Sequence, residues 1–244
     1  MPTMHAVRPS VLLAILVTMA GCSVGSYDKD YEARLRGFRG DAEFSTLAQP
    51  AESFAEHVRM RVPGGLSIPQ ANDGTNLRAK PPFLRDFPGY IAAYERMAVA
   101  GTTKLPEVLT VGVEPTARRR VADVEAMILE QVRREDSFTK AEWERGREVA
   151  PTAGGPAIWD VLSLDGDQVF EIEEGSNLVD KRLPGIGEIW VSADPKQEHA
   201  IVLAYRVPQE LAEKLDVPPK QLVELMARTA EFVEPAAEPP QDRE

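Results

Sequence analysis

The stretch EIWVSADPKQEHAIVLAYRV, residues 188–207, decides the fold class of this chain. Residues 188–193 and 199–207 are apolar and rich in β-branched and aromatic side chains, which favour strands. The residues between them, 194–198, include Asp, Pro and Lys and are typical of a turn. The pattern therefore predicts an antiparallel hairpin, and with it a sheet that is largely antiparallel.

The residues before this hairpin predict further strands of the same sheet. Residues 157–164 (AIWDVLSL) are apolar on both faces, which is expected of a central strand. Asp165-Gly166 is a strong hairpin-turn signal, so residues 168–173 are expected to return as the next strand. Residues 174–186 contain two glycines and a proline, which predicts a long loop before residue 188.

The rest of the chain supplies more strands and the helices. Strands are predicted at 57–62, 90–98 and 108–113, and helices at 117–134, 209–215 and 220–233. Thr116 is a candidate N-cap for the first helix. Thr139 and Glu142 fit a capping box, although Gly146 keeps any helix there short. The order predicts one α+β domain over residues 51–233, a mostly antiparallel sheet covered by two or three helices.

In outline, this order of elements resembles the PsbP-like fold, which is named for an extrinsic photosystem subunit and is shared with small Ran-binding proteins. The resemblance covers residues 55–233 and rests on the helix at 117–134, the strands at 157–207 and the helix at 220–233. It implies a fold and carries over no binding residue. The helix at 209–215 departs from the pattern.

The first 21 residues are typical of a cleaved secretory signal. Arg8 precedes the run VLLAILVTMA at 11–20, and small residues follow it. This ten-residue run is too short to cross a membrane, which needs roughly 20 apolar residues.

Met19-Ala20-Gly21-Cys22 resembles the lipobox of bacterial lipoproteins, Leu-Ala-Gly-Cys, with Met19 in place of Leu. The resemblance implies cleavage before Cys22 and acyl chains on its thiol and new amino group. Several acyl chains anchor a protein firmly, because each buried CH₂ adds about 0.8 kcal/mol. Ser23 follows the cysteine rather than Asp, which in diderm bacteria implies the outer membrane. Residues 22–50 would then be an acylated N-terminus and tether.

Charge and cysteine content restrict the partners. The formal charge is −11, and removing residues 1–21, whose one basic residue is Arg8, makes it −12. Such a balance disfavours nucleic acid, which is a polyanion. Cys22 is the only cysteine, so no intramolecular disulfide is possible. The tail 234–244 is acidic and rich in proline, a composition typical of disorder.

Few residues carry recognisable chemistry. After the signal, the histidines are His57 and His199, which are not in a ligand-spaced pair, so neither a metal site nor a cofactor is predicted. His57 is expected on a solvated strand face and His199 at a rim. Glu171 and Glu173 share one face of a strand, a spacing compatible with glycoside hydrolysis, but a solvated acidic face explains them better. No catalytic residue is therefore predicted.

The tryptophans separate into two groups. Trp159 and Trp190 lie in strongly apolar strands and are expected in the core. Trp143 lies among charged residues and, with Phe138, is the candidate for an exposed partner surface. The sequence therefore favours a lipid-anchored, non-catalytic binding or assembly domain with an envelope protein as partner. The alternative is an envelope hydrolase that acts on glycan or peptide through a dispersed site.

Overall fold

The computed structural model describes residues 44–48, 51–68, 84, 86–152 and 154–233. The chain forms two units, Met1–Ser45 and Thr46–Glu244, and every element below belongs to the second unit. The predicted signal peptide, Cys22 and the predicted disordered tail lie outside the described residues. Among the residues described, none of the helices is both long enough and apolar enough to cross a bilayer.

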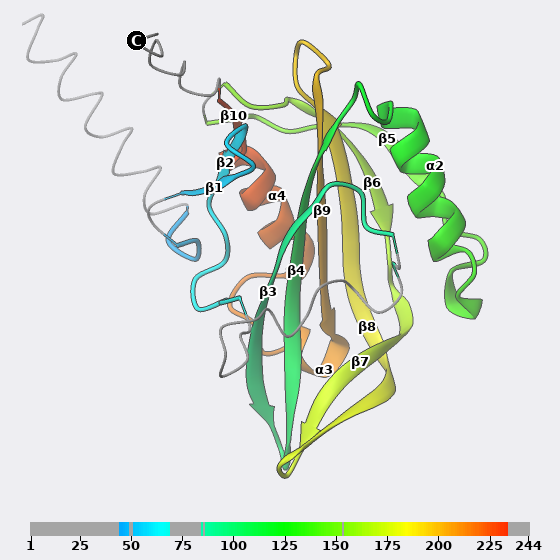
Figure 1. The fold of residues 1–244 in the computed structure, drawn as a ribbon. Helices are drawn as coiled ribbons and strands as arrows, with labels where there is room; N and C mark the ends of the chain where they lie inside the picture. Colours follow the sequence, from blue (N-terminus) through cyan, green and yellow to red (C-terminus); the bar gives the residue numbers. More distant parts are fainter. Residues whose placement is uncertain (1–43, 49–50, 69–83, 85, 153, 234–244) are drawn as a thin grey trace, which may run out of the picture. The chain divides into compact units, whose positions relative to one another are not determined.

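The domain is built on a seven-stranded antiparallel sheet (Figure 1). Its strands are β3 (Tyr90–Ala100), β4 (Thr103–Pro115), β5 (Trp143–Glu148), β6 (Ile158–Ser163), β7 (Gly166–Glu174), β8 (Asn177–Ala193) and β9 (His199–Pro208). The order is β3-β4-β7-β8-β6-β5, and β9 pairs with both β4 and β8. Thus β7 and β9 fill successive parts of the space between β4 and β8: β7 pairs with β4 at Thr103 and Lys104, and β9 pairs with it at residues 108–115.

The hairpin predicted from residues 188–207 is present, because β8 pairs with β9 across the turn at 194–198. The prediction of a hairpin at Asp165-Gly166 was wrong. Strand β6 pairs with β5 and with β8, and it does not pair with β7. The predicted loop at 174–186 was also wrong. Residue 175, a glycine with φ of +66°, forms the turn, and β8 begins at Asn177. The first part of β8 is mostly exposed and polar, so it lacks the apolar pattern that marks a strand.

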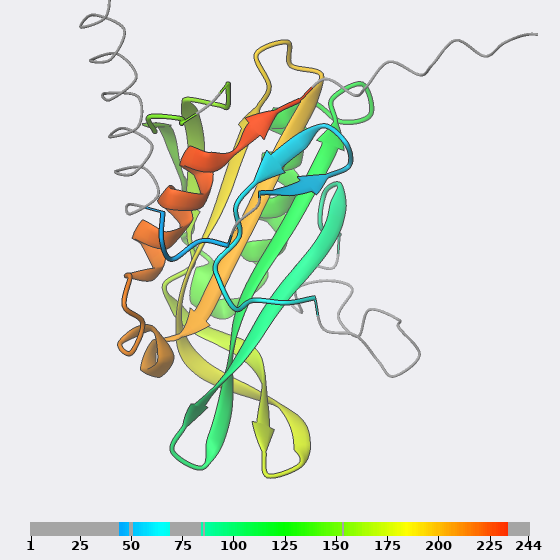
Figure 2. The same cartoon turned by 90° about the vertical axis from the view of Figure 1, so that its left-hand side faces the viewer.

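Helices cover both faces of the sheet (Figure 2). Helix α2 (Val121–Val132) lies on one face, whereas α3 (Gln209–Ala212) and α4 (Pro219–Thr229) lie on the other. Near α4 a small second sheet is formed by β1 (Glu52–Phe54), β2 (Val58–Met60) and β10 (Glu231–Phe232), in the order β1-β2-β10. This is the predicted α+β class, an antiparallel sheet covered by helices.

Several details of the helix predictions were wrong, and the helix predicted at 209–215 spans only Gln209–Ala212. Helix α2 begins at Val121, and Thr116 is no N-cap, because its hydroxyl donates to the carbonyl of Gln197 in the β8–β9 turn. The capping-box pattern at 139–142 begins no helix; a short 3₁₀ helix, η1 (Asp136–Phe138), precedes it, and strand β5 follows. The last helix ends at Thr229, so Phe232 lies in strand β10.

Both faces of the sheet carry apolar side chains. On the α2 face, Val124, Ile128 and Val132 of the helix pack with residues of β6, β8 and β9. Trp159 and Trp190 are fully buried, and their rings meet edge to face with centroids 5.8 Å apart. The prediction that these two tryptophans belong to the core is confirmed. Rings of this size contribute much of the buried apolar area, which drives folding.

Candidate functional site

A cleft of about 340 Å³ opens where the tip of the β8–β9 hairpin meets the small sheet. It is lined by His57, Gly154, Asp194, Pro195, Lys196, Glu198, His199, Phe232 and Val233. Its volume is within the range of small-ligand sites, which is about 300–1,000 Å³. Its lining combines an apolar wall from β10 with several polar groups from the turn. This combination is typical of a binding site.

The two histidines meet in this cleft. Their rings stack with centroids 4.0 Å apart and an angle of 24° between the planes. His57 lies just before β2, and its carbonyl accepts a hydrogen bond of 2.8 Å from the Val233 N–H beyond β10. His199 is the first residue of β9. His57 is therefore half-buried against His199 rather than placed on a solvated strand face, which corrects the sequence interpretation.

Asp194 organises the turn that holds His199. One carboxylate oxygen accepts from the Glu198 N–H at 2.7 Å, and the other accepts from the His199 N–H at 3.2 Å. The Asp194 N–H in turn donates to the His199 carbonyl at 3.0 Å. Asp194 is buried, with 8% of its surface exposed. These bonds fix its carboxylate beside the His199 ring, where Oδ2 lies 3.5 Å from Nδ1.

The cleft therefore gathers nitrogen and oxygen donors. Asp194, Glu198 and His199 lie in one turn, and one donor atom of each lies within 4.8 Å of the other two. The ring of His57, which is distant in the sequence, stacks on His199. No such site was predicted, because His57 and His199 are not a ligand-spaced pair and the acidic residues beside His199 were assigned only to a turn. The missing signal was strand β10, whose residues were assigned to the last helix.

The predicted partner surface at Phe138 and Trp143 is not supported. Phe138 is buried at 5% exposure in the cluster beneath α2, so it is a core residue. Trp143 packs partly against the same cluster, and the Arg145 guanidinium lies 5.8 Å from its ring centroid. The charged neighbours of Trp143 in the sequence suggested that it is exposed. However, alternate residues of a strand face opposite sides, and in β5 Trp143 faces the core.

The acidic pair Glu171 and Glu173 lies on β7, and neither residue lines the histidine cleft. The Glu173 carboxylate accepts from Lys104 Nζ of β4 at 2.7 Å. Both side chains of this ion pair are partly exposed. The Lys104–Glu173 ion pair therefore links β4 to β7 at the surface. This position agrees with the interpretation of the acidic residues as a solvated strand face.

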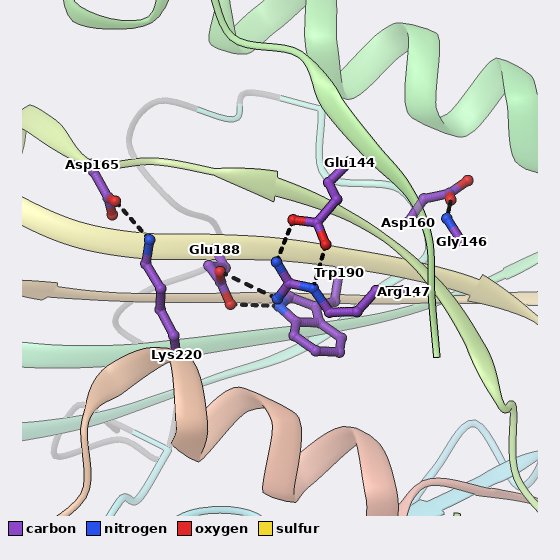
Figure 3. A network of polar contacts seen from close by, with 8 residues as sticks. All are labelled: Glu144, Gly146, Arg147, Asp160, Asp165, Glu188, Trp190 and Lys220. Atoms are coloured by element: carbon purple, nitrogen blue, oxygen red, sulfur yellow. Dashed lines mark hydrogen bonds and ion pairs between the residues drawn. The ribbon is translucent and has the colours of Figure 1, made fainter. Parts of the chain in front are cut away.

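A second polar cluster surrounds Glu188 on β8 (Figure 3). Glu188 is fully buried, and its carboxylate accepts from the Trp190 indole N–H at 2.8 Å. A guanidinium nitrogen of Arg147 lies 3.5 Å from the other oxygen, and the same group lies 5.0 Å from the Trp190 ring centroid. Burial raises the pKa of Glu188, whereas Trp190 and Arg147 act to lower it.

A bulge in β5 positions Arg147. The register against β6 shifts between Glu144 and Arg147, and Gly146 adopts φ of +69°, a conformation that glycine tolerates. The Gly146 N–H donates to Asp160 at 2.8 Å (Figure 3). Glu144 and Arg147 then face the same side, and Arg147 Nε donates to Glu144 at 2.8 Å. The cluster joins β5 to β8, so we assign it a stabilising role.

Comparison with known proteins gives little further guidance. No family model and no curated protein matches the chain. Among solved structures, the Saccharomyces cerevisiae Ran-binding protein Mog1p is similar over 77% of this chain and 97% of that chain, at 13% identity and a TM-score of 0.41.

Proposed function

We propose that this chain is a lipid-anchored lipoprotein of the bacterial envelope, whose α+β domain binds an envelope protein through a surface that includes the histidine cleft. The observation that carries the proposal is the cleft itself, where His57, Asp194 and His199 converge beside an apolar wall. Export and anchoring are supported by the signal pattern and by the lipobox at 19–22. Placement at the outer membrane is supported by Ser23.

We also propose that the domain has the PsbP-like fold. The support is the order of its elements: strands, helix α2, the strands β6 to β9, and then the terminal helix α4. The short helix α3 between β9 and α4 is the departure noted in the sequence.

A hydrolase acting on envelope glycan or peptide is the second candidate. The observation that favours it is the placement of Asp194 against the His199 ring, since a carboxylate beside an imidazole can orient a general base. Among the described residues that line the cleft there is no serine, threonine or cysteine, so hydrolysis here would use the His199 base to activate a water molecule. We rank binding first, because both carboxylate oxygens of Asp194 already accept backbone N–H bonds that fix the turn.

Replacing Cys22 by alanine tests the anchoring directly. In a diderm bacterial host, the wild-type chain is expected in the membrane fraction, and the Cys22→Ala chain in the soluble periplasmic fraction, because several acyl chains are lost. Mass spectrometry of the wild-type N-terminus is expected to show acylated Cys22 as the first residue. Ser23→Ala is the matched control and should stay on the membrane. Equal fractionation of the Cys22→Ala and wild-type chains would exclude a lipid anchor at this position.

A further inference from the structure

The donor atoms of the histidine cleft suit one chemical class of ligand. The His199 imidazole adjoins the carboxylates of Asp194 and Glu198, and the His57 ring stacks on the His199 ring. Mixed nitrogen and oxygen donors suit divalent ions of the zinc type. Calcium and magnesium prefer oxygen ligands alone, and copper(I) prefers sulfur.

The spacing of Asp194 and His199 fits two ligands of one ion. Oδ2 of Asp194 lies 3.5 Å from Nδ1 of His199, which is too long for a strong charge-assisted hydrogen bond. Ligands of a tetrahedral zinc ion, with bonds of about 2.0–2.1 Å, lie about 3.3 Å apart. An ion can therefore bridge these two atoms with little movement of either side chain.

The third ligand comes from the same turn, and the small sheet supplies the facing wall of the cleft. Glu198 is exposed in the same turn, and its carboxylate lies within 4.8 Å of the first two donor atoms. His57 arrives from the small sheet and already contacts the His199 ring. Because Glu198 is exposed, its carboxylate can turn toward the ion, whereas the His57 ring packs on the His199 ring and limits the rotation of that ligand. Lys196 also lines the cleft, so its ammonium group would lie near the bound ion.

The turn is organised before any ion arrives. Backbone N–H groups of Glu198 and His199 fix the Asp194 carboxylate, as described above, and the neighbouring strands β8 and β9 hold both ends of the turn. Outer hydrogen bonds of this kind orient metal ligands and strengthen binding. A bare surface cluster of carboxylates has no such support.

We infer that the cleft is a binding site for a divalent transition-metal cation of the zinc type, held by Asp194, Glu198 and His199, with the His57 ring packed on His199. The inference rests on the proposed function only because both use the same cleft. Three protein ligands leave the fourth position of a tetrahedral ion open to water or to a side chain of the partner. The site would thereby present an ion to a protein that docks on this surface.

The test is a zinc titration of the full-length mature protein. The protein carries no histidine tag, is purified in detergent, and is freed of bound metal with a chelator before the titration. Isothermal titration calorimetry with Zn²⁺ is expected to give one ion per chain with a dissociation constant of about 1 μM or lower. His199→Gln is expected to weaken binding at least about tenfold, and His57→Gln, which removes the ring that packs on His199, is expected to weaken it less. Glu174→Gln, at the distant β7–β8 turn, is the matched control and should leave the affinity unchanged. Circular dichroism establishes that each variant is folded.

A second readout identifies the ligands when a variant fails to fold. X-ray absorption of the wild-type zinc complex is expected to show one histidine nitrogen and otherwise oxygen neighbours. Millimolar Ca²⁺ or Mg²⁺ should not displace the ion. Absence of zinc binding at 100 μM (about a hundredfold above the expected dissociation constant), or stoichiometric binding that the His199→Gln variant retains, would overturn the inference. Neither result would change where the Cys22→Ala chain fractionates, so failure of the metal site is distinguishable from failure of the lipid anchor.

Discussion

Trp190→Ala is expected to lower the free energy of unfolding by about 4 kcal/mol, because removing a buried indole loses its transfer free energy and leaves a cavity. Trp190 is fully buried and contacts the edge of Trp159. Its N–H also donates to the buried carboxylate of Glu188, which loses that donor in the variant. Urea unfolding followed by circular dichroism measures the change.

Trp143→Ala is the matched control for this prediction. Trp143 is only partly buried, so the same truncation removes less apolar contact and is expected to cost about half as much. Where Trp190→Ala expresses poorly, Trp190→Phe keeps most of the ring and allows measurement. A loss below about 1 kcal/mol for Trp190→Ala would mean that the sheet is not packed as described.

Arg147→Ala is expected to destabilise the fold by about 3 kcal/mol at neutral pH, since it leaves Glu188 buried without its cationic partner. The effect should depend on pH. Burial already raises the pKa of Glu188, and loss of Arg147 raises it further. A carboxyl whose pKa is raised in the folded state favours folding while protonated, and this advantage is lost as pH rises through the folded pKa. The variant should therefore be closest to the wild type in acid.

Urea unfolding at pH 7 and at pH 5 measures this dependence. The destabilisation by Arg147→Ala should shrink towards pH 5, where a larger fraction of Glu188 is protonated in the variant. The control is Lys181→Ala, which breaks a half-exposed ion pair with Glu174 and should change stability by no more than about 1 kcal/mol at either pH. An equal effect of Arg147→Ala at both pH values would contradict the assigned coupling to Glu188.

The central part of the fold was predictable because its signals are local. The β8–β9 hairpin has apolar residues 188–193 and 199–207 on both sides of a polar turn, and Trp159 lies in the mostly apolar strand β6. The arm formed by β7 and the first part of β8 was not predictable in the same way. Its outer strand is mostly polar and exposed, so backbone pairing holds it rather than burial of an alternating apolar face.

The stacking of the two histidines was not predictable, because it depends on tertiary contacts alone. His57 reaches His199 only because the small sheet, closed by the two-residue strand β10, packs beside the β8–β9 turn. A strand that short has no periodicity to detect. Phe138 shows the opposite error, since its polar sequence neighbours concealed its place in the core beneath α2.

The most direct test of the central claim, that the anchored domain binds an envelope protein through the histidine cleft, is cross-linking in intact cells. Wild-type protein, tagged after Glu244, is captured and its partners identified by mass spectrometry, beside Cys22→Ala, a folded His57→Gln/His199→Gln double variant, and Glu174→Gln as control. We predict that one or a few envelope proteins are enriched with the wild type and the control, and depleted with the other two variants. Recovery of the bait alone, or capture of the same proteins by the double variant, would contradict the claim.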